Sequence, residues 1–494
     1  MIHAFIDLVH PLTFVIILGA SILGVILGAI PGLSGGLGVA LLLPVTFGME
    51  AATGLAMLVA IWVGGVSGAM VGSILLGIPG SPSAIATCFD GYPMTRKGQA
   101  VKALGAAITA SFLGTFFSIL IAAWLSPIIA DLALKLGPWE YFSLGFCAIA
   151  LVASLSRDNV GKGMAAAALG LLAACVGFAP IDGTARFSFG NMYLSSGFDL
   201  IAMMLGLFAL KQIVMDFARG TRAVQKVEAR NISGFGVTLQ EFRDNAWNLV
   251  RSFGIGIWIG FLPGMGAALS NMVAYAQAKS ASKHPEKFGK GCIDGVFASE
   301  VSNNASVGGS VIPMIALGIP GDGTTAILLG GLMIHGIQPG PLLFTNNPEI
   351  VYTVFATALL SAVMVLVVQF FGMRLFPAIL KVPYHYLYPP IVVLSFVGVF
   401  VNTGGAYIFA MLLGFAALGI LMDLVKLPIS PFILAFILGP MLESNLRKGF
   451  TYSTDGAWAF LTRPISAGLL AIAVFSILWP YLKPLLIRRR LSHG

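Results

Sequence analysis

Two acidic residues lie inside long stretches of apolar and small residues. Asp322 stands in the segment GIPGDGTT, and Glu300 precedes it in ASEVSNNAS, where Ser302 follows two positions later. A carboxylate among apolar residues is expensive unless a cation or a proton compensates its charge. We therefore predict that Asp322, Glu300 and Ser302 hold a coupling sodium ion or proton, with no other metal and no cofactor. Asp322 has a second role open to it, because an aspartate here suits the N-cap of a helix that begins near Thr324.

Uncharged polar residues accompany both carboxylates and suit the binding of an organic anion. Asn303 and Asn304 share a helical face with Glu300, and such a face can form the polar wall of a cavity. The alternative is hydrogen bonding between helices, which is worth about 1 kcal/mol or less per contact. Further candidate substrate ligands are the hydroxyl groups of Thr324, Thr325, Ser81 and Ser83.

Two proline-glycine segments interrupt apolar runs, and each predicts a re-entrant hairpin. The first is IPGLSGG and the second is FLPGMGAALSN. Glycine allows a close approach of the backbone to a ligand, and Ser or Asn supplies neutral hydrogen-bonding groups. Tight packing of the hairpins is the alternative for some of the glycines. The candidate substrate ligands, set opposite one another by the alignment of the two segments, are Ser34, Gly35 and Gly36 in the first hairpin and Gly266, Ser270 and Asn271 in the second.

The composition places these motifs in a membrane. The 494 residues are 57% hydrophobic and 10% charged, with a mean hydropathy of +0.93, whereas soluble domains carry about 25% charged residues. Apolar runs of about twenty residues recur without the alternation of strands, which predicts helices in a lipid bilayer. The net charge of +8 lies in short loops, as the positive-inside rule predicts, so we expect no nucleic-acid partner.

The motifs occur twice along the chain. GAIPGLSGGL at 28–37 aligns without a gap with GFLPGMGAAL at 260–269, and LGIPGSPSA at 76–84 aligns with LGIPGDGTT at 317–325. Several matches in the same order indicate an internal duplication. The loop after the first broken helix contains Arg96 and Lys97, but the matching second loop has no basic residue. Because basic loops are cytoplasmic, the two copies are predicted to have opposite orientations.

We therefore predict an all-α polytopic membrane protein with two inverted repeats. It should have about 11 transmembrane helices plus two re-entrant hairpins and broken helices. The N-terminus is expected in the periplasm and the C-terminus in the cytoplasm. Residues 431–442 either cross the membrane or are re-entrant. The expected regions are the first inverted repeat at 11–217, a basic cytoplasmic linker at 218–245, the second inverted repeat at 246–445, and a C-terminal transmembrane helix with a basic tail at 446–494.

Enzyme signatures are absent from the sequence. No HExxH motif or His/Cys cluster occurs, and no GxxxxGK[ST] motif indicates ATP hydrolysis. We therefore expect no enzyme. The alternative is an intramembrane enzyme in which Asp322 and Glu300 act as a carboxylate pair.

Long motifs of this chain resemble the large integral-membrane subunit (TctA family) of tripartite tricarboxylate transporters. They include GAIPGLSGGLGVALLLP, the region ASEVSNNASVGGSVIPMIALGIPGDGTTAILLGG, and FILGPMLESNLRKG near the end, and the likeness extends from about Leu18 to Leu486. The resemblance implies a secondary active transporter, or symporter, of the bacterial inner membrane that imports citrate-like tricarboxylates or dicarboxylates. It also implies two partners, a small membrane subunit and a periplasmic solute-binding protein.

Overall fold

The computed structural model describes residues 2–154, 160–218, 236–380, 382, 384–403 and 405–491. Almost all of these residues are helical, as the backbone of a membrane protein requires when no water satisfies its polar groups. The strands of the described part form one small antiparallel hairpin, in which β1 (Gly177–Phe178) pairs with β2 (Ala185–Arg186). The predicted all-α architecture of a multi-pass membrane protein is confirmed at this level.

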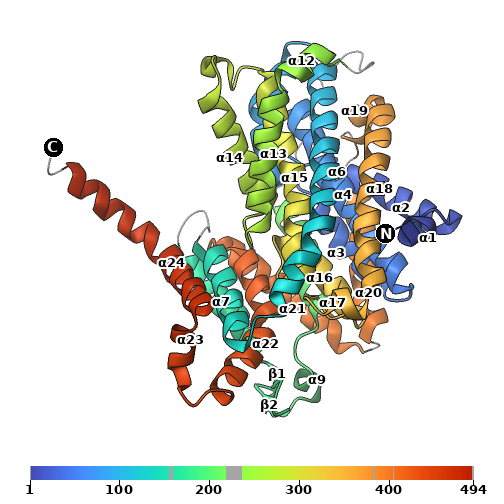
Figure 1. Cartoon of the computed structure of the whole chain (residues 1–494). Coiled ribbons are helices and arrows are strands. Elements are labelled where there is room, and N and C mark those ends of the chain that lie inside the picture. Colours follow the sequence, from blue (N-terminus) through green and yellow to red (C-terminus); the bar gives the residue numbers. More distant parts are fainter. Residues whose placement is uncertain are drawn as a thin grey trace.

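A central bundle contains both sets of motifs (Figure 1). Its first half consists of α2 (Pro11–Ala29), α3 (Gly35–Thr46), α4 (Ala51–Leu76), α5 (Ile85–Arg96) and α6 (Ala100–Ala133). Its second half consists of α13 (Ala246–Phe261), α14 (Gly266–Ala281), α15 (Ile293–Leu317), α16 (Gly323–Ile334) and α18 (Pro348–Gly372). In the first half, a break that contains the short segment η1 (Pro82–Ala84) separates α4 from α5. In the second half, the corresponding break separates α15 from α16.

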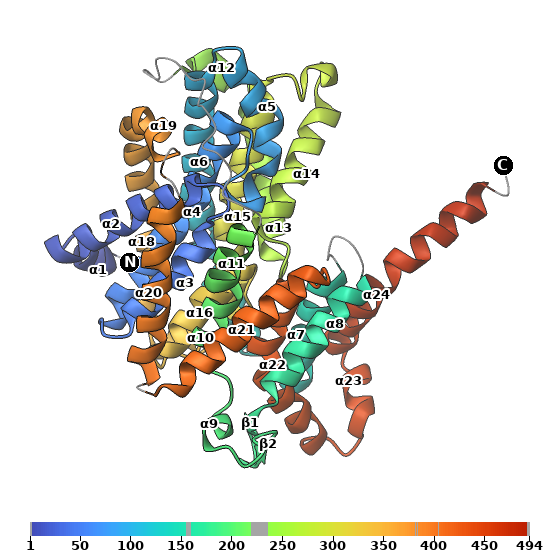
Figure 2. The same cartoon turned by 180° about the vertical axis from the view of Figure 1, so that it is seen from behind.

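Further helices pack beside this bundle, as Figure 2 shows from behind. One group contains α7 (Pro138–Ser154), α8 (Val160–Ala174), α22 (Ile429–Thr451) and α24 (Pro464–Leu491). The other contains α10 (Leu200–Met204), the π-helical segment η2 (Leu205–Leu210), α11 (Lys211–Ala218), α20 (Tyr384–Thr403) and α21 (Tyr407–Leu424). The remaining short elements are α1 (Ile2–Leu8), α9 (Met192–Ser195), α12 (Leu239–Asp244), η3 (Pro285–Lys287), α17 (Leu343–Asn346), η4 (Met373–Leu375), α19 (Phe376–Ile379), η5 (Gly456–Trp458) and α23 (Ala459–Thr462).

Among the described residues, fewer helices qualify as membrane crossings by length and composition than the about 11 expected from the sequence. Within the described ranges, seven helices are long and apolar enough to cross, or up to eight if one bent pair counts as a span. Shorter apolar helices such as α7 and α8 fall below that length, and α15 is long but rich in polar residues. The segment 431–442 lies within α22, a continuous helix of 23 residues that qualifies as a span. α22 also continues past the boundary predicted at 445, whereas most of the basic linker, including Arg219, Arg222, Lys226 and Arg230, lies outside the described residues.

Glycines at aligned positions allow a close helix contact within each half. A Cβ at Gly28 of α2 would lie 2.2 Å from the carbonyl oxygen of Gly65, and one at Gly260 of α13 would lie 2.5 Å from that of Ser306. Both pairs are related by the sequence alignment. The helix pairs α2–α4 and α13–α15 can therefore approach so closely only because glycine stands at these contacts.

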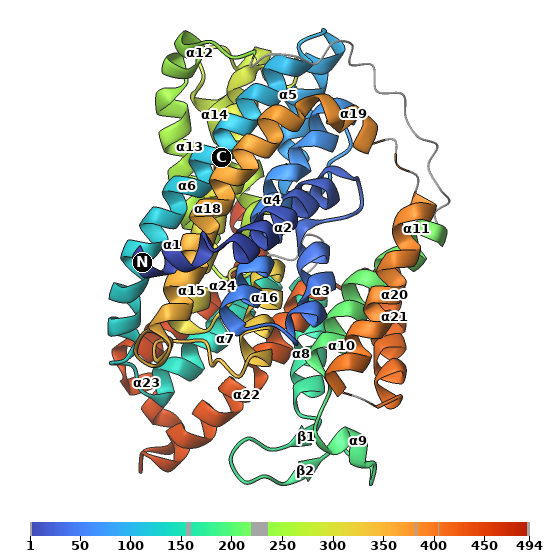
Figure 3. The same ribbon diagram turned by 90° about the vertical axis from the view of Figure 1, so that its right-hand side faces the viewer.

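The two broken helices also end alike. Gly77 after α4 has φ +69°, and Gly318 after α15 has φ +71°. In each case the following isoleucine N–H bonds a carbonyl six residues back, Ile78 to Gly72 and Ile319 to Pro313. Glycine in the left-handed conformation is a common end of a helix. α5 lies near one end of the bundle, and α16 lies nearer the other (Figure 3).

Candidate functional site

The centre of the bundle contains a fully buried carboxylate. Glu300 on α15 has no exposed surface, and it accepts hydrogen bonds from Thr87 Oγ1 at 2.5 Å and from Ser111 Oγ at 3.2 Å. Thr87 belongs to α5 and Ser111 to α6, so three helices converge on one side chain. Across the described part of the chain, Glu300 forms no ion pair. The negative charge is thus held by uncharged donors alone, an arrangement that needs a proton or a bound cation.

Asn304 extends this polar cluster by one turn of α15. Its side-chain nitrogen donates to Ser111 Oγ at 2.9 Å, and its oxygen accepts from Ser67 Oγ at 2.8 Å and Thr115 Oγ1 at 3.2 Å. Glu300 and Asn304 are four residues apart, so they lie on one face of the helix. The buried side chains of this cluster are Glu300, Asn304, Ser111, Ser67 and Thr115. Their oxygen atoms are of the kind that binds hard monovalent and divalent cations.

The second hairpin helix lies against the same stretch of α15. Asn271 on α14 accepts the backbone N–H of Ala86 at 2.8 Å and donates to Ser299 O at 3.1 Å. Ser270 Oγ donates to Ser302 O at 3.3 Å, and Ser302 Oγ donates to Ser270 O at 3.0 Å. Asn271 therefore joins the second hairpin to the break of the first half. Ser270 and Ser302 use their hydroxyl groups to fix α14 against α15.

Asp322 forms the N-cap of α16. Its Oδ1 accepts the backbone N–H of Thr325 at 2.7 Å, and the Thr325 hydroxyl accepts the backbone N–H of Asp322 at 2.8 Å. This reciprocal pair is a capping box, which satisfies two N–H groups that the helix end leaves unpaired. The capping role considered from the sequence is therefore present in the structure.

Each predicted hairpin (α2–α3 and α13–α14) contacts the broken helix of the other half, α15–α16 for the first and α4–α5 for the second. A Cβ at Gly36 of α3 would lie 2.8 Å from Thr324 Oγ1, whereas one at Gly35 would meet Gly65 of α4. Ser34 caps α3 by accepting the N–H of Leu37 at 3.2 Å. On the other side, α14 packs against η1 and α5. The starts of α3 and α16 thus meet at one place, where helix N-termini present N–H groups to an anion.

The other predicted ligands lie close to these crossings. Ser81 and Ser83 bond one another through their hydroxyl groups at 2.6 Å beside the first break. Gly266 lies against Asp322, since a Cβ there would be 2.7 Å from the Asp322 Cβ. Asn303 is fully buried, and within the described residues neither its Nδ2 nor its Oδ1 has a partner of hydrogen-bond geometry. A buried amide of this kind is costly unless something binds it.

The two carboxylates do not form a pair. Asp322 is bonded within the first turn of α16, whereas the partners of Glu300 come from α5, α6 and α15. No cluster of three or more His, Cys, Asp or Glu side chains suited to a metal occurs in the ranges that the structure describes. The geometry therefore lacks the shared proton of a carboxylate dyad.

Asp90 is a buried carboxylate that the sequence pattern did not single out. Its Oδ1 accepts the backbone N–H groups of Gly289, Gly291 and Cys292 at 2.8–2.9 Å. Its Oδ2 accepts the hydroxyl of Tyr275 at 2.8 Å. Asp90 on α5 thus fixes the loop that leads into α15. The acidic residue beside a glycine, in FDGYP, was the available signal, but its partners lie about 200 residues away in the sequence.

A separate cavity of about 590 Å³ lies between α6, α12 and α13. Its lining is apolar and includes Phe117, Trp124, Phe253 and, on α15, Val301. Carboxylates need hydrogen-bond donors or cations, which this lining does not provide. The cavity is therefore distinct from the polar cluster around Glu300.

Comparison with known proteins agrees with this architecture. The model of the Tripartite tricarboxylate transporter TctA family matches residues 14–434. This chain belongs to that family. A protein of Agrobacterium vitis described as "Uncharacterized 52.8 kDa protein in TAR-I ttuC' 3'region" is 33% identical over 454 residues, which are 92% of this chain and 90% of that protein.

A second protein from the same organism matches part of the TctA-family chain. It is described as "Uncharacterized protein in TAR-II ttuC' 3'region" and is 32% identical over 224 residues, 45% of this chain and 92% of that protein. No solved structure is found to match the chain. The family is one of transporters, so the comparison favours transport over catalysis.

Proposed function

We propose that this chain is the membrane subunit of a secondary transporter that imports citrate-like carboxylates through the bacterial inner membrane. The observation that carries the proposal is Glu300, a fully buried carboxylate held by hydroxyl and amide groups at the junction of α5, α6 and α15. A side chain of this kind inside a membrane bundle suits a site that takes up and releases a coupling sodium ion or proton. Membership in the family supports the class of substrate.

The transport mechanism that we propose uses two inverted repeats. The equivalent contacts of Gly28 and Gly260, and the equivalent helix ends at Gly77 and Gly318, support a duplication. The opposite placement of α5 and α16 supports the inversion (Figures 2 and 3). Alternating access then exchanges the conformations of the two halves around a site that stays near the middle of the bilayer.

The carboxylate substrate is proposed to bind where each hairpin crosses the other half. The start of α16, with Thr324, lies against Gly36 of α3, and both helix N-termini present N–H groups. Helix N-termini bind anions without a lysine or an arginine. Asn303 lies beside Glu300 on α15, and its buried amide is proposed to contribute to the same site. In this mechanism Asp322 orders α16, and Glu300 is the main residue for the coupling ion.

The proposed sidedness follows from the basic residues. Lys97 binds the carbonyl of Lys290, and Lys102 at the start of α6 pairs with Glu241 of α12, so these basic residues lie at the end of the bundle that carries α12 (Figure 1). The positive-inside rule makes this the cytoplasmic end. We place the hairpin of β1 and β2, at the opposite end, in the periplasm, where a solute-binding protein would deliver the substrate. The predicted small membrane subunit completes the system.

Uptake of labelled citrate into proteoliposomes tests the proposal. The vesicles contain this chain with its small membrane subunit, the binding protein is added outside, and a sodium gradient or a proton gradient is imposed separately. We expect uptake with one of the two gradients and none when that gradient is dissipated. If no citrate, other tricarboxylate or dicarboxylate enters under either gradient, the proposed function is wrong.

A further inference from the structure

The connection between α8 and α10 carries a surface that the transport site does not use. Six large apolar side chains within 16 positions are between 48% and 88% exposed, and we refer to them as the aromatic patch: Phe178, Ile181, Phe187, Phe189, Met192 and Tyr193. The patch lies on β1, on α9 and on the segments on either side of β2, at the end of the molecule away from α12 (Figures 1 and 3). Contiguous exposed apolar surface of this kind marks an interaction site.

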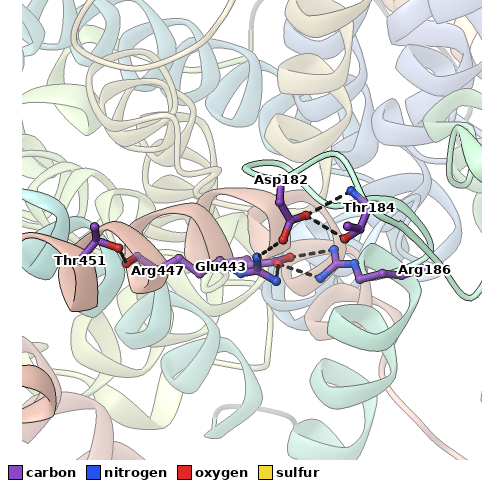
Figure 4. Close-up of polar contacts among 6 residues, drawn as sticks. All are labelled: Asp182, Thr184, Arg186, Glu443, Arg447 and Thr451. Atoms are coloured by element: carbon purple, nitrogen blue, oxygen red, sulfur yellow. Dashed lines mark hydrogen bonds and ion pairs between the residues drawn. The ribbon is translucent and has the colours of Figure 1, made fainter.

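The aromatic patch is held rigidly by ion pairs to α22 (Figure 4). Arg186 binds Glu443 through two hydrogen bonds of 2.7 and 2.9 Å. Arg447 binds Asp182 at 2.8 Å and Glu443 at 2.9 Å. A bidentate arginine–carboxylate contact fixes direction as well as distance. The hairpin is therefore pre-organised, which lowers the entropy lost when a partner binds.

Two aromatic residues of the patch have a strained backbone conformation. Phe187 has φ +51° and Phe189 has φ +50°, values that bulky residues rarely adopt. Phe187 directly follows Arg186, whose guanidinium is bonded to Glu443. Tyr193 is stacked on Tyr407 at the start of α21, with ring centroids 4.2 Å apart. Strain that persists at an exposed tip indicates that the exposed position of these rings has a function.

We propose that the aromatic patch is the docking surface for the soluble protein that delivers the carboxylate. The inference rests on the proposed function. Aromatic residues and methionine are enriched, and charged ones depleted, in the centres of protein–protein interfaces. A membrane surface would instead attract free lysine and arginine side chains, yet Arg186 and Arg447 of this region are already paired with carboxylates.

The size of the aromatic patch favours a separate protein over a permanent second copy. Six side chains with these exposures offer roughly 600–900 Å² on this side, because a buried aromatic side chain covers about 150–250 Å². That area matches one side of a standard-size interface between two proteins that associate and separate, whereas permanent dimers bury more. A delivering protein must dissociate after each transfer, so an interface of this size suits it.

Binding measurements in nanodiscs test the docking surface. The probe is the substrate-loaded solute-binding protein of the same system, and the variants are Phe189→Ser, Met192→Ser and, as a matched control, Phe371→Ser. Phe371 is 74% exposed on α18 but belongs to the opposite end of the bundle. We expect about tenfold or greater weakening for Phe189→Ser, a smaller loss for Met192→Ser, and none for the control. Equal affinity of all variants, or no binding by the unchanged chain, overturns the proposal.

Two further measurements address the other occupants. The unchanged chain has seven tryptophans, so the readout is the extra fluorescence of Phe189→Trp relative to it. Quenching of that extra fluorescence by brominated lipids without the binding protein would place the patch in the bilayer and overturn the proposal. A change in oligomeric mass for Phe189→Ser would assign it to a second copy and overturn it as well. Uptake separates the two proposals: if the unchanged chain imports carboxylate and Phe189→Ser binds and imports equally well, only the docking surface is wrong.

Discussion

α4 and α15 are equivalent helices with the same packing and different chemistry. Both contact their neighbours through small residues, and both end in a left-handed glycine followed by Ile-Pro-Gly. At equivalent positions, however, α4 has Leu58, Val59, Ile61, Trp62 and Val63, whereas α15 has Ser299, Glu300, Ser302, Asn303 and Asn304. All ten side chains are buried. Both helices thus have small residues at their close contacts, whereas α15 has a run of polar side chains where α4 has apolar ones.

Under the duplication that we propose, two similar halves contain an asymmetric site. α4 has no matching run of polar residues at these positions. It instead packs through apolar side chains, of which Trp62 is among the largest fully buried ones. We infer one coupling-ion site, in the second half, within a framework that both halves build equally.

The largest effect is expected from alanine at the shared glycine contacts. Gly28→Ala and Gly260→Ala each place a Cβ within 2.5 Å of a backbone carbonyl oxygen, so the helices must separate. We expect a loss of about 3 kcal/mol or more for each and little monodisperse protein in detergent. Gly19→Ala and Gly254→Ala are matched controls, since nothing lies within 4 Å of a Cβ at either. Tolerance of Gly260→Ala alone would show that the two halves are not packed equivalently.

Removal of the Glu300 charge is expected to abolish ion coupling while the fold persists. Glu300→Gln keeps a group that can accept hydrogen bonds from Thr87 and Ser111 but cannot balance a cation. Coupling between two ligands typically changes affinity by about 5- to 150-fold, and this dependence of substrate affinity on the ion should vanish. Citrate binding to the reconstituted complex with and without the ion measures it.

Val59→Ala is the control for that variant. Val59 is the position in α4 that corresponds to Glu300. The change should reduce thermal stability by about 1 kcal/mol but leave ion dependence intact. Unchanged ion dependence in Glu300→Gln would assign coupling to another group, and Asp322 would be the next candidate.

A moderate effect is expected at the N-cap of α16. Asp322→Ser gives the second half the residue of the first, Ser81, and serine also caps helices well. Asp322→Ala removes the cap and should cost about 1 kcal/mol, whereas Asp322→Ser should restore most of it. Thermal unfolding and ion-dependent uptake of both variants provide the measurement. If both variants lose ion dependence equally, Asp322 binds the ion in addition to its capping role.

The sequence was sufficient for the features that lie within one helix. The Pro-Gly motifs predicted the breaks, and the spacing of Glu300 and Asn304 predicted a shared face. It could not identify Thr87, Ser111 and Ser67 as their partners, because these belong to three other helices. A signal was available in Ser111 and Thr115, which are spaced four apart in α6, but such pairs commonly have only structural roles.

The sequence also could not predict that each hairpin contacts the opposite half of the molecule. Alignment of the copies relates Ser34 to Gly266, yet Gly36 contacts Thr324 of the second half, and α14 packs against η1 and α5 of the first half. Contacts of this kind depend on how two halves dock, which internal similarity does not encode. The sequence also did not fix the number of membrane crossings. A polar helix such as α15 is not recognised as a span by its hydropathy, and apolar helices such as α8 are shorter than a typical span.

The smallest effect is expected in the loops that differ most between the halves. The segment that joins α8 to α10 contains β1, β2 and the aromatic patch. The segment that joins α21 to α22 is short and comprises only residues 425–428. Hydrogen bonds from Thr184 and the ion pair with Arg447 lower the pKa of Asp182 to about 2. The stability from this group is therefore present above the usual pKa of 3.8 and is lost as the pH falls toward 2. Hydrogen exchange of residues 177–193 should consequently be unaffected by Asp182 titration between pH 5 and pH 8.

Asp182→Asn removes the charge of this residue at every pH, so the contribution of the charge to the protection of residues 177–193 can be measured. We expect several-fold faster exchange in residues 177–193 at pH 6, with no change in α15 or in the overall melting temperature, because exposed ion pairs contribute little to global stability. Glu286→Gln is the matched control. Glu286 is an exposed acid whose pKa is lowered by a backbone hydrogen bond and by His284, in the loop that leads to α15. If Asp182→Asn left the exchange of the hairpin unchanged, Arg186 and Glu443 alone would be sufficient to hold it.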